Sequence, residues 1–157
     1  MRELFLVRHG QAEAASSGGD AARVLTREGR ESIAAAGLGL SALAVRPAAL
    51  WHSPYARAVE TASLLAEPLG VGATALRGEP LLVPGGSVER AARAILDADA
   101  ASLMCVSHMP LLPELAGRLL GMRLDFGTGT VAHLALVGPR GAALVGLWSA
   151  ELLARVR

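Results

Sequence analysis

The sequence predicts an α/β fold with three layers, in which a mostly parallel central sheet carries helices on both faces and an antiparallel hairpin at one edge. Three observations support this prediction. Mostly apolar runs at residues 4–7, 50–52 and 103–106 have the length and continuity of buried strands. Segments with helical periodicity separate these runs, an alternation typical of parallel sheets. Residues 131–137 and 142–148 are joined by a short segment containing glycine and proline, which indicates the hairpin.

The first strand and the first helix are separated by a small-residue segment. After residues 4–7, the Ala, Ser and Gly of residues 12–19 indicate a flexible loop. Thr26 is a favourable helix N-cap, and the apolar residues after it recur on one helical face as far as Arg46-Pro47. Because a proline disfavours helical geometry in the residue before it, we expect the helix to end there.

The middle of the chain is predicted to contain two more helices and a short strand. Ser53 as N-cap and Pro54 at the first helical position begin a helix that ends at Gly70. Residues 73–77 indicate a short edge strand, a loop rich in proline and glycine follows, and Ser87 caps the next helix.

The last third of the chain contains the most apolar strand. Residues 103–106 show no polar alternation, which predicts a central position in the sheet. Pro110 begins a short helix after this strand, and the hairpin turns through the segment Gly138-Pro139-Arg140-Gly141.

The composition indicates one folded domain over residues 1–157, with a core that buries roughly two-thirds of the unfolded surface. Apolar residues make up 52% and charged residues 18%, which excludes a disordered chain. The formal net charge is +1 without a basic cluster, so we expect no nucleic-acid partner. No signal-peptide pattern and no run of about 18 apolar residues occurs, which predicts a cytoplasmic protein that does not bind membranes. The pattern favours no particular oligomeric state.

Two features of residue usage affect how the polar side chains are interpreted. The chain has fifteen Arg and no Lys or Asn, so an arginine is weaker evidence for a phosphate site here than in an ordinary sequence. Gln11 is the only side-chain amide and lies two residues after His9, which makes it a candidate for phosphate or substrate binding. The single Cys105 lies inside an apolar strand, where a cysteine is usually a small buried hydrophobe and not a nucleophile.

Two predicted strands end in a histidine at the same edge of the sheet. Arg8 and His9 follow the first strand, and His108 follows the central one. In open α/β sheets the carboxyl ends of the strands hold ligands, so these side chains are expected to meet. The helix predicted to begin at Ser53 carries Arg57 in its first turn. Two histidines, two arginines and a helix N-terminus are groups that bind and transfer a phosphoryl group.

Four blocks in series carry a family resemblance. They are residues 6–11 (LVRHGQ), 25–29 (LTREG), 53–61 (SPYARAVET) and 106–110 (VSHMP). In this order they resemble the histidine phosphatase superfamily, also called phosphoglycerate mutase-like. The small size, the last block and the turn Pro84-Gly85-Gly86 are similar to the short bacterial phosphohistidine phosphatases of the SixA type.

The resemblance implies a role for each matched residue. His9 is the expected nucleophile, which attacks phosphorus to give a phosphohistidine intermediate that water then hydrolyses. Arg8 and Arg57 are expected to pair with phosphate oxygens, and Ser53 joins them at the helix N-terminus as a candidate binding residue. His108 is expected to donate a hydrogen bond to the same phosphoryl group. These groups supply the positive charge, so we expect no metal and no other cofactor.

Two departures from the family pattern bear on the substrate. Ala14 and Ala15 stand where the mutases have a Trp-Asn pair that contacts the sugar acid, which argues against a mutase. Larger members also have a glutamate that protonates the leaving oxygen; here Glu79 lies in the right region, but its neighbours do not match. An imidazole leaves readily without a dedicated acid, since the pKa of its conjugate acid is about 6.5. We therefore expect P–N bonds to suit this site better than P–O bonds.

Three functions follow from these patterns. The first is a metal-independent phosphatase that acts on phosphohistidine in a partner protein, favoured because a short chain without a cap domain leaves the site open. The second is a phosphomonoesterase for a small phosphorylated metabolite, with Glu79 as the general acid. The third is a non-catalytic module that binds phosphorylated partners, against which His9 argues because a pure binder needs no nucleophile.

Overall fold

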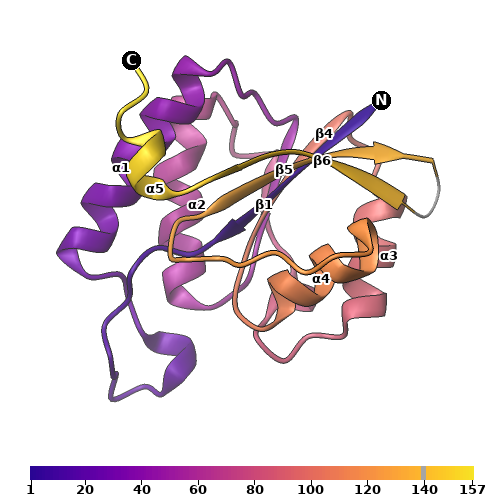
Figure 1. Cartoon of the computed structure of the whole chain (residues 1–157). Helices are drawn as coiled ribbons and strands as arrows, with labels where there is room; N and C mark the ends of the chain where they lie inside the picture. Colours follow the sequence, from indigo (N-terminus) through magenta and orange to yellow (C-terminus); the bar gives the residue numbers. More distant parts are fainter. Residues whose placement is uncertain (139–140) are drawn as a thin grey trace.

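Strand β1 (Arg2–Arg8) lies inside a six-stranded sheet (Figure 1). The structure, a computed structural model, describes residues 1–138 and 141–157. The strand order is β3-β2-β4-β1-β5-β6. The other strands are β2 (Ala49–His52), β3 (Leu76–Gly78), β4 (Ser102–Ser107), β5 (Val131–Val137) and β6 (Gly141–Trp148). The first four strands in this order pair in parallel, whereas β5 pairs antiparallel with β1 and with β6. The predicted mostly parallel sheet with an antiparallel edge hairpin is confirmed.

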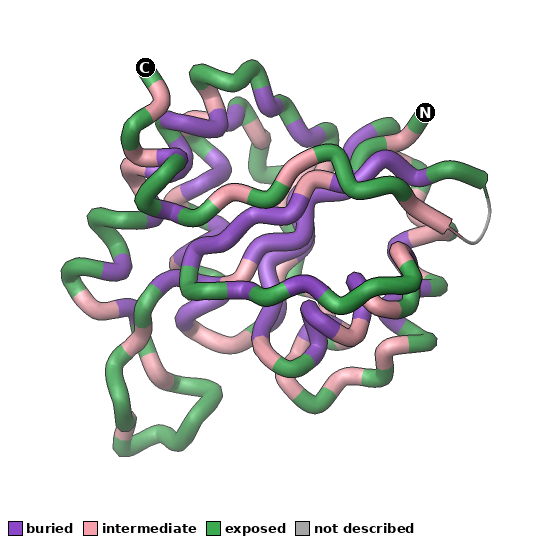
Figure 2. Tube along the Cα trace, in the orientation of Figure 1, coloured by how far each residue is buried: buried purple, intermediate pink, exposed green. Residues whose placement is uncertain are grey.

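Helices cover both faces of the sheet, as predicted for three layers (Figure 1). One core joins the sheet to α1 (Arg27–Ala42), α2 (Ala56–Leu69) and α5 (Ala150–Leu153). The other core joins the opposite face to α3 (Val88–Asp97) and α4 (Leu111–Leu120). The buried residues follow the central strands, whose inner residues are apolar because both faces are covered (Figure 2). No described helix is long and apolar enough to cross a membrane.

Local sequence signals explain where most of these helices begin and end. The Thr26 hydroxyl accepts a hydrogen bond from the Gly29 N–H at the start of α1, and the Ser87 hydroxyl does the same for Arg90 in α3. Gly70 ends α2 in the left-handed region, at φ 72°, where a residue without a Cβ is favoured.

Three boundaries and one short helix differ from the sequence predictions. Helix α2 begins at Ala56, because the Ser53 hydroxyl accepts the N–H of Tyr55 in a turn before the helix, and so Ser53 is not its N-cap. Helix α1 ends at Ala42, before the expected Arg46-Pro47, and β3 begins three residues later than expected. The short α5 was not predicted, since four residues show no apolar period. Pro139 and Arg140 of the predicted turn lie outside the described residues.

The register of β1 and β4 decides which side chains meet at the carboxyl edge of the sheet. Arg8 pairs with Ser107, the last residue of each strand. The next residues are His9 and His108, and the His9 N–H donates to the Ser107 carbonyl at 3.1 Å. Two histidines 99 positions apart in the sequence therefore come together through strand pairing.

Candidate functional site

His9 is buried and has a defined tautomer. Its Nδ1 lies 2.7 Å from the Gly10 carbonyl oxygen, which can only accept, so Nδ1 carries the proton. Its Nε2 then has a free electron pair, toward which Arg57 Nε donates at 3.2 Å. The main chain is tightly packed here, since a Cβ at Gly10 would come within 2.7 Å of the Ile33 side chain. The loop thus presents an unprotonated, fixed nitrogen of the kind a nucleophile needs.

Arg57 contacts both the nucleophile candidate and the loop that follows β1. It is the second residue of α2 and is buried. Its Nη1 donates to the backbone carbonyl of Asp20 at 2.8 Å, and its Nη2 lies 3.2 Å from Asp20 Oδ2. Its guanidinium carbon lies 5.1 Å from the centre of the Tyr55 ring, which supports it from another side.

His108 is buried without a partner for either ring nitrogen among the described residues. Its ring centre lies 5.0 Å from that of His9 and 5.2 Å from that of Tyr55. A buried polar group without a hydrogen bond is costly, so such groups in a native protein call for an explanation. A bound group with oxygen acceptors and donors would satisfy His108.

Arg8 reaches the same region from β1 and is held by the segment that leads into β5. Its Nη1 donates to the Phe126 carbonyl at 2.8 Å, and its own N–H donates to the Thr130 carbonyl at 3.0 Å. Its Nε is buried and, within the described part of the chain, has no hydrogen-bond partner. The anchor of Arg8 is therefore a backbone carbonyl, which no side-chain motif in the sequence could indicate.

Burial and the arginines control protonation at the site. Burial is the largest cause that lowers the pKa of His9 to about 4, and the positive charges of Arg57 and Arg8 act in the same direction. Burial likewise lowers the pKa of His108 to about 3, together with the nearby His9 and Arg57. Both imidazoles are neutral at neutral pH in this state. We expected negative charge beside His108 to favour its protonated form. The charge of Asp20 raises the pKa of His108 but is outweighed by burial, so the protonated form requires a further, bound anion.

The three other candidates from the sequence, Gln11, Ser53 and Glu79, make hydrogen bonds with other parts of the chain. Gln11 is exposed, and its side-chain oxygen accepts from the Thr26 hydroxyl at 3.0 Å. Ser53 is fully buried, and its hydroxyl oxygen accepts a hydrogen bond from the N–H of Tyr55 at 3.2 Å. Both carboxylate oxygens of Glu79 are engaged, one by the Leu81 N–H at 3.1 Å and the other by Arg77 at 3.0 Å.

Sequence reasoning missed two charged residues at the site, Asp20 and Arg23. They lie in or beside the short 3-10 turn Asp20–Ala22, within a segment that the sequence presents as a small-residue loop. Arg23 Nη1 pairs with Asp20 Oδ1 at 2.8 Å, and its charge contributes to lowering the pKa of His9. The only signal for them was a pair of opposite charges three residues apart after the glycines.

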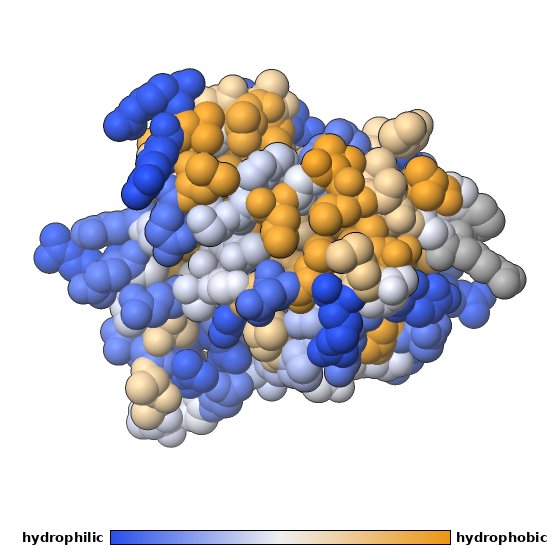
Figure 3. All heavy atoms as spheres, viewed as in Figure 1, coloured by the Kyte–Doolittle hydropathy of each residue, from blue (hydrophilic) through white to orange (hydrophobic). Residues whose placement is uncertain are grey.

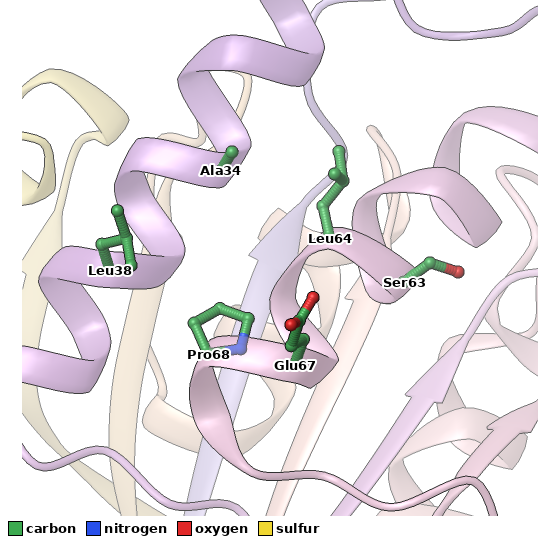
Figure 4. A pocket seen from close by; sticks show the side chains of 6 residues that line it. All are labelled: Ala34, Leu38, Ser63, Leu64, Glu67 and Pro68. Atoms are coloured by element: carbon green, nitrogen blue, oxygen red, sulfur yellow. The ribbon is translucent and has the colours of Figure 1, made fainter.

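Two pockets have no histidine among their lining residues. One, of about 390 Å³, lies between α1 and α2 (Figure 4). Its lining residues are Ala34, Leu38, Ser63, Leu64, Glu67 and Pro68. The other, of about 220 Å³, adjoins Gly10 and Gln11 and includes the carboxylates of Glu28 and Glu151, which disfavour a phosphate there.

Cys105, His133 and the exposed apolar residues of the edge hairpin do not contribute to the group of side chains around His9. Cys105 is buried in β4, and burial raises the pKa of its thiol, so it is an inert apolar residue as expected. His133 pairs with Glu3 at 3.0 Å on the sheet. Apolar side chains gather on the surface of the edge hairpin, where Leu144, Val145 and Leu147 are exposed (Figure 3).

Comparisons with known proteins concern the family and the fold of the chain. A family model described as histidine phosphatase superfamily (branch 1) matches residues 4–82, half of the chain. No curated protein matches significantly. A solved structure of the protein histidine phosphatase SixA complexed with tungstate is similar at a TM-score of 0.88 and 24% identity, over 95% of this chain and 97% of that one.

Two further solved structures show the same fold. The putative phosphohistidine phosphatase SixA from Agrobacterium tumefaciens has a TM-score of 0.81 and 19% identity, over 94% of this chain and 97% of its own. A phosphoserine phosphatase mutant from Entamoeba histolytica, in complex with phosphoserine, has a TM-score of 0.72 and 15% identity, over 98% of this chain and 100% of its own. The chain shares its fold with these proteins over nearly its whole length.

Proposed function

This chain belongs to the histidine phosphatase superfamily and is a phosphatase of that type, and we propose that its substrate is phosphohistidine in a partner protein. In this proposal His9 is the nucleophile, and Arg8, Arg57 and His108 bind the phosphoryl group. The reaction needs no metal, because the two guanidinium groups supply the positive charge.

The observation that carries the proposal is the set of unpaired buried atoms around His9. Both ring nitrogens of His108 and the Nε of Arg8 are buried and lack a partner among the described residues. A transferring phosphoryl group has three non-bridging oxygens that can accept hydrogen bonds from such groups. The unprotonated His9 Nε2, whose electron pair accepts from Arg57 Nε, lies in the same region. The related SixA protein binds tungstate, a tetrahedral oxyanion, which also supports a phosphoryl site.

The proposed reaction has two displacements. In the first, the electron pair of His9 Nε2 forms a bond to phosphorus while the substrate bond breaks. The proton stays on Nδ1 and is donated in a hydrogen bond to the Gly10 carbonyl, which keeps the ring oriented. In the second, water attacks phosphorus, the electron pair of the P–N bond returns to His9 Nε2, and the protons of the water leave with the phosphate or pass to solvent. The phosphate dianion would raise the pKa of His108, so that His108 can donate to a phosphate oxygen in both steps.

The surroundings of Glu79 favour a P–N bond over a P–O bond. An alkoxide must be protonated as it leaves, whereas imidazole leaves as a stable neutral molecule. Both oxygens of the Glu79 carboxylate already accept hydrogen bonds, from Leu81 and Arg77. A phosphomonoesterase that uses Glu79 as its acid would have to break one of these contacts. The cytoplasmic location and the absence of a nucleic-acid partner stay predictions.

A rapid-quench experiment over a substrate panel tests the proposal. The panel contains a phosphohistidine peptide, phosphoserine and sugar phosphates, each with radioactive phosphate. We expect acid-labile phosphate on the wild-type chain and the highest kcat/KM for the peptide. Much faster hydrolysis of the alkyl esters would contradict the proposed substrate and favour the metabolite phosphatase. Binding of the peptide without any covalent phosphate or release would favour the non-catalytic module.

A further inference from the structure

The carboxylate of Asp20 occupies the edge of Arg57 that an oxyanion would use. The Nε–H and one Nη2–H of an arginine point the same way and form the fork that pairs with two oxygens of one oxyanion. In Arg57 the first faces His9 Nε2 and the second faces Asp20 Oδ2, each at 3.2 Å. A carboxylate oxygen therefore stands beside the nucleophile, in a position a phosphate oxygen would take.

This contact can be displaced while the residue stays near the site. The Asp20 side chain is 54% exposed although Arg57 is buried, so water can solvate the carboxylate when it leaves Arg57. The backbone carbonyl of Asp20 separately accepts from Arg57 Nη1 at 2.8 Å, so the residue stays anchored when its carboxylate moves. Arg23 holds the other carboxylate oxygen at 2.8 Å. An arriving phosphoryl group would replace Oδ2 on the fork and leave a carboxylate next to the departing group.

The Asp20 carboxylate remains charged at neutral pH. The hydrogen bond from Arg23 is the largest cause that lowers its pKa below the usual value, and Arg57 acts in the same direction. Asp20 is therefore a poor proton donor and a good hydrogen-bond acceptor.

A carboxylate at this place distinguishes between leaving groups. A phosphorylated imidazole can carry a proton on its second ring nitrogen, and that N–H is attracted to a carboxylate. An alkyl or aryl ester has no such proton, and its oxygens are repelled. We propose that Asp20 is a specificity-determining residue that accepts a hydrogen bond from the leaving imidazole and so selects phosphohistidine over oxygen esters, an inference that rests on the proposed function.

The step balances without an acid from the enzyme. The electron pair of His9 Nε2 forms the new P–N bond, and the pair of the breaking P–N bond stays on the substrate ring nitrogen. The second ring nitrogen keeps its proton, so the ring departs as neutral imidazole. Asp20 remains a carboxylate throughout and stabilises the protonated ring, in which the P–N bond is weakest.

The test compares two substrates in two variants. Phosphoimidazole has the N–H, and p-nitrophenyl phosphate has a good leaving group without one. Asp20→Asn removes the charge at nearly constant size, and Asp97→Asn is the matched control, an exposed aspartate paired with Arg93 in α3 on the other face of the sheet. We expect Asp20→Asn to lower kcat/KM for phosphoimidazole by about 10- to 100-fold, the effect of one hydrogen bond to a charged group. The value for p-nitrophenyl phosphate should be unchanged or higher, and the control should alter neither.

A second measurement uses inorganic phosphate as a competitive inhibitor. Because the Asp20 carboxylate no longer competes for the Arg57 fork, Asp20→Asn should bind phosphate about two- to fivefold more tightly. Equal changes in kcat/KM for both substrates would overturn this inference alone and leave the phosphatase proposal standing. If wild type hydrolyses p-nitrophenyl phosphate but not phosphoimidazole, both proposals fail.

Discussion

The carboxyl ends of β1 and β4 each deliver a buried histidine to the same edge of the sheet, yet the two imidazoles have opposite surroundings. Both nitrogens of His9 are engaged, one by the Gly10 carbonyl and the other by Arg57. Neither nitrogen of His108 has a partner among the described residues. Residue type and burial are nearly the same at the two strand ends. Hydrogen bonding therefore distinguishes the proposed nucleophile, which is oriented, from His108, which we propose binds the phosphoryl group.

The largest effect should come from the β1 end. His9→Ala removes the nitrogen that we propose attacks phosphorus, so we expect turnover to fall by on the order of 10⁴-fold or more. Acid-labile phosphate should disappear from the chain, which rapid quench with radioactive substrate measures. Covalent phosphate retained by this variant would show that another residue attacks phosphorus.

A smaller effect is expected at the β4 end. His108→Gln keeps a hydrogen-bond donor but loses the cationic form, and the removal of one such stabilising group costs about 10²–10³-fold in kcat. Because His9 is intact, the phosphoenzyme should still form, more slowly. Single-turnover kinetics measures how fast the phosphoenzyme forms in each variant. If His108→Gln formed no phosphoenzyme at all, the two histidines would not have the different roles proposed here.

The pH dependence of stability tests whether both His9 and His108 are buried in their neutral form. The pKa values of His9 and His108 are lowered to about 4 and about 3, from 6.5 in the unfolded chain. Below pH 6.5 the unfolded chain binds more protons than the folded one, so the free energy of unfolding falls as the pH falls toward 4. Between pH 7.5 and 5 we expect a loss of about 1–2 kcal/mol per histidine, measured by urea unfolding. Replacing either histidine with Gln should reduce this loss, and an unchanged pH profile would contradict the assignment.

The smallest effect concerns the loop after β1. Gln11→Ala removes the contact with the Thr26 hydroxyl at the start of α1, which should cost about 0.5–1.5 kcal/mol of stability. Urea unfolding measures this change, while kcat/KM should stay within a factor of two or so of wild type. A tenfold loss of kcat/KM in a stable variant would instead make Gln11 a ligand of the substrate.

Much of the site follows from local patterns. Arg8, His9 and His108 come directly after apolar runs that only a covered sheet can bury, and parallel strands align their carboxyl ends. Arg57 follows from its place near the start of a helix with a clear apolar period. The start of α2 was predicted wrongly because the Ser53 hydroxyl is equally able to stabilise a turn before the helix.

The amino-acid sequence by itself determined the layers of the fold, the order of its elements and the residues that reach the sheet edge, because periodicity and capping act over a few neighbouring positions. Only the tertiary structure decided which atoms are paired there. The lack of a partner for the His108 ring among the described residues and the approaches of Arg57 to His9 and of Asp20 to Arg57 depend on segments that are far apart in the sequence. Such contacts depend on how the loops pack against the folded sheet, and the spacing of neighbouring residues in the sequence does not predict them.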